Sequence, residues 1–178
     1  MADQDGVVQM MEHYGKLYYY LAREMLDTFG VEGEKALRRG IREFARDRGR
    51  TLRERHQAAG IDVNVKSLAE HYDMPGSRTG AYRRTFIQLD EDNRVSETYI
   101  CQLAQLWERL GNEEGLRIGS IYCDEFHPAM WGEYDQDIQT TLPRLLTKHD
   151  PHCRFEVHRI PHPPSKEDSD LVPPSDQQ

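Results

Sequence analysis

A cysteine and a histidine lie four residues apart in the segment GSIYCDEFHPAMWGEY (119–134), where they are Cys123 and His127. Side chains at positions i and i+4 of a helix lie on the same face, so a helix here would place the thiol next to the imidazole. Such a pair is typical of a catalytic nucleophile with its base, of half a metal site, or of ordinary packing. The spacing by itself leaves all three interpretations open.

The residues around this pair predict a short helix. Ser120 can act as its N-cap, and Pro128 would end or bend it. Cys123 would then lie in the first turn, where free N–H groups and the helix dipole favour a thiolate, and His127 would act as base or charge partner. Free cysteine is also among the most buried residue types, so packing remains the alternative.

Two further cysteines extend the set of candidates. Cys101 opens a predicted helix directly after a strand, which makes it a rival catalytic nucleophile, whereas Cys153 begins a strand and is expected in the core. Three widely spaced cysteines do not predict a disulfide framework. Together with His127 the three thiols could hold tetrahedral zinc or another divalent metal if the fold gathered them, so the cofactor is left open.

One basic block stands out in an acidic chain. Residues 35–55 contain nine basic and three acidic residues, most of them expected on a solvated helix face. Arg48 differs, because at 100° per residue it falls within the apolar stripe between Phe44 and Leu52. A charge there needs a partner. The partner is either a carboxylate of the protein or the carboxylate of a substrate held bidentately.

The first third of the chain predicts two long helices. Residues 7–29 form the first, which Gly30 ends, and residues 32–59 form the second. Gly15 and Gly40 lie inside these helices, where glycine costs about 1 kcal/mol relative to alanine. A close helix crossing would explain both glycines.

Shorter elements follow the two helices. The sequence predicts a short helix at 65–72, turns at 73–80, a hairpin at 82–100, a helix at 101–110 and a C-terminal pair of strands joined at 148–152. The predicted class is α+β, with the long N-terminal helices packed on a small antiparallel sheet and short helices before the C-terminal hairpin. We expect one domain over 1–160 and a disordered tail over 161–178, which holds five of the nine prolines.

Composition narrows the function classes. The chain has 23 basic and 31 acidic residues, a net charge of −8, so nucleic acid and anionic membrane surfaces are poor partners. No run of 18 apolar residues and no signal-peptide pattern occur, and we expect a cytoplasmic protein. No Gly-rich phosphate loop, HExxH or serine elbow is present. A homo-oligomer remains open.

The chain resembles the L-2-amino-thiazoline-4-carboxylic acid hydrolase family. The resemblance rests on YGKLYYYLA (14–22), FGVEGEKALRRGIREFARDRGRTLRERH (29–56), CQLAQLW (101–107), YCDEFHPAMWGEY (122–134) and LLTKHDPHCRF (145–155). It implies an enzyme that opens a cyclic amidine bearing a carboxylate, with water adding at the C=N carbon of an aminothiazoline ring to give a carbamoyl-cysteine. The family pattern has an aspartate where this chain has His127, which points to another substrate, another mechanism or lost activity.

For such a hydrolase of a small-molecule substrate the residue roles can be stated as expectations. Cys123, assisted by His127, would attack the amidine carbon, with a metal-bound hydroxide as the second route. Arg48 would grip the substrate carboxylate. Tyr14 and Tyr18, on or near the inner edge of the first helix, would line the pocket and donate hydrogen bonds.

Two other function classes stay open. One is a non-catalytic module that binds a small ligand or zinc, similar in build to the vinyl-reductase-type domains. The other is an interaction protein whose basic helix binds an acidic partner. The inward phase predicted for Arg48 argues against the second, because a docking surface needs its charges outside.

Overall fold

The computed structural model describes residues 4–72 and 82–160. The turns predicted at 73–80 and the tail predicted at 161–178 lie outside the described residues. The domain boundary at residue 160 therefore stays a prediction.

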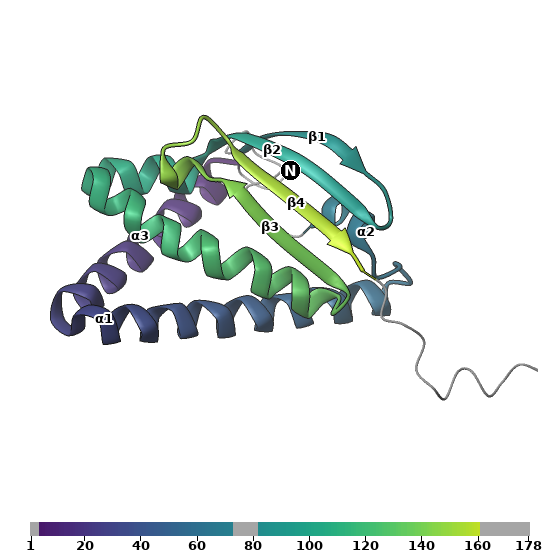
Figure 1. Cartoon of the computed structure of the whole chain (residues 1–178), viewed down its shortest axis with the longest axis horizontal. Helices are drawn as coiled ribbons and strands as arrows, with labels where there is room; N and C mark the ends of the chain where they lie inside the picture. Colours follow the sequence, from purple (N-terminus) through teal and green to yellow (C-terminus); the bar gives the residue numbers. More distant parts are fainter. Residues whose placement is uncertain (1–3, 73–81, 161–178) are drawn as a thin grey trace, which may run out of the picture.

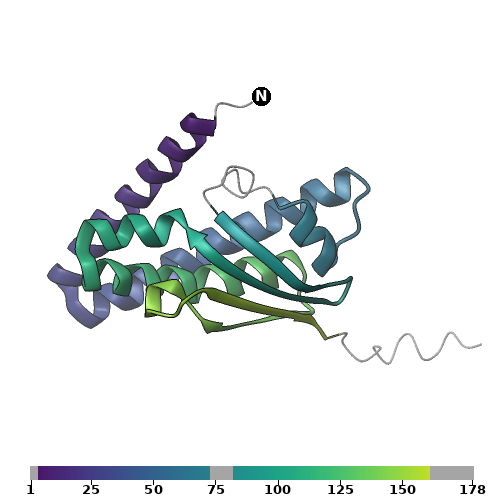
Figure 2. The same cartoon turned by 90° about the horizontal axis from the view of Figure 1, so that it is seen from above.

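The N-terminal helices form as the sequence predicts. Helix α1 covers Gln4–Ala58, and Gly30 interrupts it with a backbone φ of 53° and ψ of −128°. Glycine accepts this conformation without a Cβ clash, and the chain reverses direction there. Figures 1 and 2 show the two helical segments diverging from this bend.

The remaining elements confirm the α+β class. In chain order they are α2 (Val65–Glu70), β1 (Tyr82–Leu89), β2 (Asn93–Cys101), α3 (Gln102–Tyr134), β3 (Ile138–Arg144), the 3₁₀ turn η2 (Leu146–Lys148) and β4 (Cys153–Arg159). The strands lie in the order β1-β2-β4-β3, and each neighbouring pair is antiparallel. Helix α3 lies between the sheet and the second segment of α1 (Figure 1).

Helix α3 differs from the prediction in its second part. The helix predicted at 101–110 forms from Gln102 onward, with Cys101 as the last residue of β2, and Asn112, with φ of 48°, bends it. The chain then continues as helix to Tyr134, so the short helix expected to begin at Ser120 is wrong. Ser120 lies inside α3, where its hydroxyl donates to the carbonyl of Arg117 (2.8 Å), and Pro128 does not end the helix. Buried aromatic residues on both sides of Pro128 hold this part of the helix in place.

A close helix crossing explains one of the two glycines at which the sequence predicted such a crossing. A Cβ at Gly15 would lie 2.6 Å and 2.8 Å from the side chains of Leu106 and Leu103, so the crossing expected there is confirmed. In the described part of the chain, Gly40 has no neighbour within 4 Å of such an atom, and the crossing expected there is wrong. Gly49 takes that place, because its Cβ would clash with the backbone oxygen of Met130 on α3.

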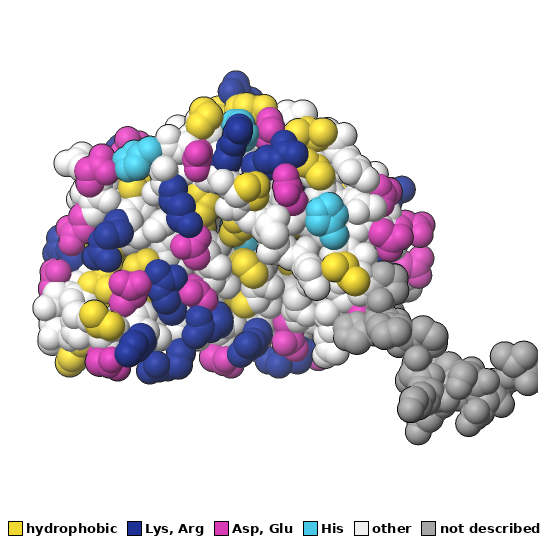
Figure 3. Space-filling view, viewed as in Figure 1, with side chains coloured by type: hydrophobic (Ala, Val, Ile, Leu, Met, Phe, Trp, Pro, Cys, Tyr) yellow, Lys and Arg dark blue, Asp and Glu magenta, His cyan; other side chains and the backbone are white. Residues whose placement is uncertain are grey.

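The basic block of α1 is matched by acids. Arg38 and Arg42 both pair with Glu125 of α3, at 2.9 Å and 2.5 Å, and Arg46 pairs with Glu43 at 2.7 Å. Figure 3 shows dark blue and magenta side chains interleaved along α1. Ion pairs of this kind give most basic residues of the block a nearby carboxylate partner, as expected for a solvated helix face. Within the described ranges, no helix is long and apolar enough to cross a membrane.

Candidate functional site

A cavity lies between the inner face of the sheet and α3. Its empty volume is about 670 Å³, which includes its open mouth. The described residues that line it come from the sheet, from α3 and from the end of the α2 region. They are Tyr72, Tyr82, Arg84, Thr98, Cys101, Leu103, Trp107, Tyr122, Cys123, Phe126, His127, Trp131, Cys153 and Phe155. A concave, mostly apolar lining with a few polar side chains is typical of a small-molecule site.

Aromatic rings form most of the walls. Tyr122 and Phe126 stack at 4.9 Å between ring centroids with 14° between their planes. The His127 ring lies 5.0 Å from both Trp131 and Phe155. These separations are typical of well-packed aromatic pairs, so the walls are formed by mutually supporting rings.

The three cysteines and His127 lie around one cavity, an arrangement that the sequence allowed but did not predict. Cys101, Cys123, Cys153 and His127 all line this one cavity. Over 4–72 and 82–160, however, no group of three or more His, Cys, Asp or Glu side chains is arranged so that it could hold a metal ion. One of the thiols already has a partner, because the amide of Leu146 donates to Cys153 Sγ at 3.3 Å.

The electrostatics of the Cys123–His127 pair differ from those expected at a helix start. Cys123 lies in the interior of α3, not in its first turn, so the helix-dipole argument for a thiolate does not apply. Burial raises the pKa of the Cys123 thiol well above its ordinary value. Burial, and then the charges of Arg84 and Arg94, lower the pKa of His127 to about 3. At neutral pH both groups are therefore uncharged.

The other two thiols have the same character. Burial is the largest effect on both, raising the pKa of Cys101 and bringing that of Cys153 to about 12. Backbone hydrogen bonds oppose burial at each sulfur but are weaker. The cavity thus presents neutral thiols rather than a preformed thiolate.

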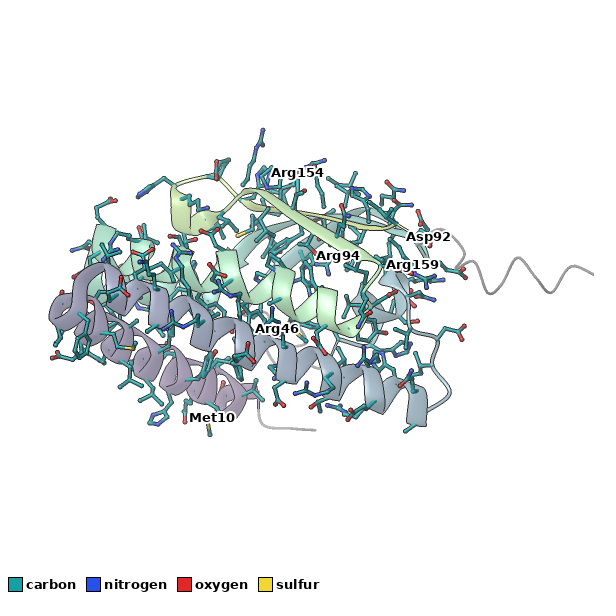
Figure 4. All side chains as sticks on the ribbon, turned by 60° about the horizontal axis from the view of Figure 1, so that its bottom comes forward. Met10, Arg46, Asp92, Arg94, Arg154 and Arg159 are labelled. Atoms are coloured by element: carbon teal, nitrogen blue, oxygen red, sulfur yellow. The ribbon has the colours of Figure 1, made fainter. Side chains whose placement is uncertain are left out.

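Two arginines on the inner face of the sheet are the charged feature of the site. Arg84 lines the cavity, and its Nε donates to Thr98 Oγ1, on the facing residue of β2, at 3.3 Å. Arg94, 3% exposed, donates from Nε to Ser96 Oγ at 3.1 Å, and its Nη2 is buried without a hydrogen-bond partner. Figure 4 shows Arg94 between the sheet and α3, away from Arg154 on the other face.

These guanidinium groups have no acidic partner among the described residues. The groups that act on the pKa of Arg84 are tyrosines and cysteines, and burial, the largest effect, lowers it. Burial and the charge of Arg84 lower the pKa of Arg94 to about 9. Arg94 is held instead by aromatic faces, with Trp131 at 4.8 Å and Phe155 at 5.7 Å. Over 4–72 and 82–160, the cavity therefore lies in a positive field without an acidic counter-charge.

The predicted substrate-binding residues of α1 lie behind the cavity. The hydroxyl of Tyr14 donates to that of Tyr122, a lining residue, at 3.0 Å, and Tyr18 donates to the carbonyl of Ile118 at 2.9 Å. Arg48 is half-buried and lies near enough to Tyr14 to affect the pKa of its phenol. Tyr14, Tyr18 and Arg48 are not among the described residues that line the cavity. Their predicted contact with a substrate stays a prediction.

Sequence reasoning missed the arginines and most of the aromatic walls. Strand β2 buries Arg94, Ser96 and Thr98 toward the helices and turns Glu97 and Tyr99 outward. A strand paired on both sides that buries a polar face is unusual, because buried polar groups need partners. The absence of any apolar face in NRVSETYIC was the signal that could have located the site.

Comparison with known proteins adds two findings. The model of the L-2-amino-thiazoline-4-carboxylic acid hydrolase family matches residues 10–157. Among solved structures, the chain is similar to the crystal structure of the phenol-responsive sensory domain of the transcription activator PoxR with phenol, at 14% identity and a TM-score of 0.52. The match covers 83% of this chain and 73% of that one, and at this identity it shows a shared fold alone. No curated protein matched the chain.

Proposed function

The chain belongs to the L-2-amino-thiazoline-4-carboxylic acid hydrolase family, and from this premise we propose that it hydrolyses a small cyclic C–N substrate that bears a carboxylate. The observation that carries the proposal is the half-buried guanidinium of Arg84, which lines the cavity without an acidic partner among the described residues. A buried charge without a counter-charge is costly. A bound carboxylate would supply that counter-charge.

Arg84 replaces Arg48 as the residue proposed to hold the carboxylate. Its side chain enters the cavity from β1, and the hydrogen bond from Nε to Thr98 fixes the orientation of the guanidinium plane. The terminal nitrogens can then donate two parallel hydrogen bonds to one carboxylate. Arg48, by contrast, lies on α1 beside Tyr14.

His127 is the proposed general base. It lines the cavity with Arg84, and its Nδ1 is buried without a hydrogen-bond partner. In the free protein the nearby guanidinium groups disfavour the imidazolium form. A substrate carboxylate on Arg84 would offset part of this positive charge and make His127 a stronger base. Binding would thereby prepare the site for proton transfer.

The reaction can follow two routes that use the same residues. In the first, His127 takes a proton from water as the oxygen adds to the C=N carbon and gives it to the ring nitrogen; the ring C–S bond then breaks as the carbonyl forms, and the hydroxyl proton goes to the sulfur. In the second, the Cys123 sulfur bonds to that carbon while its proton passes through His127 to the ring nitrogen, and the ring sulfur leaves and takes a proton from the exocyclic amino group. Water then adds to the same carbon, the bond to Cys123 breaks, and the two protons of water go to the exocyclic nitrogen and to the Cys123 sulfur. Each route consumes one water. The raised pKa of Cys123 favours the first.

Turnover of 2-aminothiazoline-4-carboxylate tests the proposal. We expect the wild type to open this ring or a related cyclic amidine, and His127→Gln to lose most of kcat, by about 100-fold or more. Cys123→Ala distinguishes the routes, because it abolishes the covalent route and leaves the water route intact. A wild type that opens no such compound would remove the hydrolase proposal.

A second candidate is a non-catalytic small-ligand-binding module. Two observations favour it: the fold is shared with a ligand-responsive sensory domain, and the three thiols of the cavity are protonated. Saturable binding of a carboxylated ligand without turnover would support this candidate. Binding with turnover would exclude it.

A further inference from the structure

We propose that this cavity also binds a flat, uncharged aromatic ring system carrying a single carboxylate, that is, an aryl carboxylate. The inference rests on Arg84 as the anion anchor of the proposed function, but its ligand is distinct from the cyclic amidine proposed there as the substrate. The juxtaposition that carries it is one half-buried guanidinium at the edge of an aromatic-walled cavity whose described lining contains no acid.

The charge balance of the cavity selects a monoanion. Among its fourteen described lining residues, Arg84 is the single Arg or Lys, and none is Asp or Glu. A cationic ring would therefore find no described carboxylate to pair with. A second negative charge would find no second cation among the described lining residues, because Arg94 does not line the cavity and lies against the faces of Trp131 and Phe155.

The walls select a flat apolar ring. Seven of the fourteen described lining residues are aromatic, and they come from both the sheet and the helices. Offset-stacked and edge-to-face contacts with such rings favour an aromatic ligand over a saturated one of equal size.

Arg84, which would hold the carboxylate, lies close to the aromatic rings that line the cavity. The guanidinium of Arg84 lies 5.9 Å from the centroid of the Phe155 ring, and that ring contacts Trp131 at 5.6 Å and His127 at 5.0 Å. A carboxylate on Arg84 would therefore place the attached ring next to this aromatic group.

Binding of matched ligands to the full chain tests the inference. Isothermal titration calorimetry would compare 2-naphthoate with its neutral amide, its cationic amidine and its fully saturated carboxylate analogue. We expect 2-naphthoate to bind about tenfold or more tightly than each of the three. Equal binding of the amide or amidine would overturn the monoanion, and equal binding of the saturated acid would overturn the aromatic ring.

Two neighbouring arginines give matched variants. Arg84→Gln should weaken 2-naphthoate binding about tenfold or more, whereas Arg83→Gln should leave it unchanged, because Arg83 is exposed and contacts Tyr99 on the outer face. Circular dichroism and thermal unfolding would verify that both variants fold. If Arg84→Gln does not fold, the comparison of ligands on the wild type still decides.

The experiments decide the aryl-carboxylate inference and the hydrolase proposal separately. Selective binding of 2-naphthoate by a protein that opens no cyclic C–N substrate would support the aryl carboxylate and remove the hydrolase. Turnover of 2-aminothiazoline-4-carboxylate without inhibition by 2-naphthoate would support the hydrolase and overturn the aryl carboxylate.

Discussion

Arg84 on β1 and His127 on α3 line the same cavity, and the guanidinium, after burial, is the strongest influence that keeps the imidazole uncharged. Neither side chain has an acidic partner among the described residues. The site therefore holds one positive charge and one neutral base at neutral pH. An anion that binds Arg84 changes the protonation equilibrium of His127, so ligand binding and proton transfer are coupled in this geometry.

Replacing the anchor should affect substrate binding more than folding. Arg84→Gln removes a charge-assisted contact, and we expect KM for a carboxylated substrate to rise about 10- to 100-fold. The free energy of unfolding should stay equal or increase, because the half-buried guanidinium lacks an acidic partner among the described residues. Steady-state kinetics and urea unfolding measure the two effects. An unchanged KM would show that the carboxylate binds elsewhere, with Arg48 as the next residue to vary.

The buried imidazole should make stability depend on pH. The pKa of His127 falls from 6.5 to about 3 in the folded protein, so between these values the unfolded chain binds the additional proton. The contribution to stability is present above pH 6.5 and is lost as the pH falls toward 3, with a slope of up to about 1.4 kcal/mol per pH unit. Urea unfolding between about pH 4.5 and 7.5 measures this slope.

A matched pair of variants tests whether His127 causes this pH dependence of the free energy of unfolding. His127→Gln removes the titrating group and should flatten the dependence, whereas His13→Gln changes an exposed histidine on α1 and should leave it as in the wild type. Equal slopes in the wild type and in His127→Gln would mean that His127 is not the group responsible.

The cavity thiols should react slowly in the folded protein. The thiolate is the reactive form, and burial raises the pKa of Cys101, Cys123 and Cys153. We expect alkylation by iodoacetamide at about pH 8 to be at least about tenfold slower in the native protein than in urea, at all three positions. Mass spectrometry of the labelled peptides assigns each rate. Fast labelling of native Cys123 would restore the covalent route as the leading one.

Local patterns in the sequence predicted much of the fold. Gly30 ends the first helix where expected, because glycine adopts a positive φ without a steric penalty. The hairpin expected at 82–100 also forms, around its polar turn. The error at Ser120 has a physical origin. Ser120 and Pro128 carry local signals for a start and an end, but the helix is held by the burial of residues between and beyond them, which local signals do not report.

The site was predicted in part for the same reason. Cys123 and His127 share a helix, so their spacing placed them together, and both line the cavity. Arg84 and Thr98 belong to two strands whose register is set by pairing, and a one-residue shift would turn Arg84 outward. No local pattern distinguishes Arg84 from Arg83. Their opposite environments follow from the pairing of β1 with β2, which sequence spacing does not define.

The crossing of α1 and α3 should distinguish two glycines of the same helix. Gly49→Ala would push a Cβ into the backbone oxygen of Met130, and we expect a loss of about 1–3 kcal/mol in the free energy of unfolding. Gly40→Ala meets no atom within 4 Å and should stabilise the protein by about 0.5–1 kcal/mol, because alanine favours the helix. Urea unfolding of both variants measures the difference. Similar effects of the two substitutions would contradict the close approach of α1 to α3 at Gly49, and with it the packing that holds the helical wall of the cavity in place.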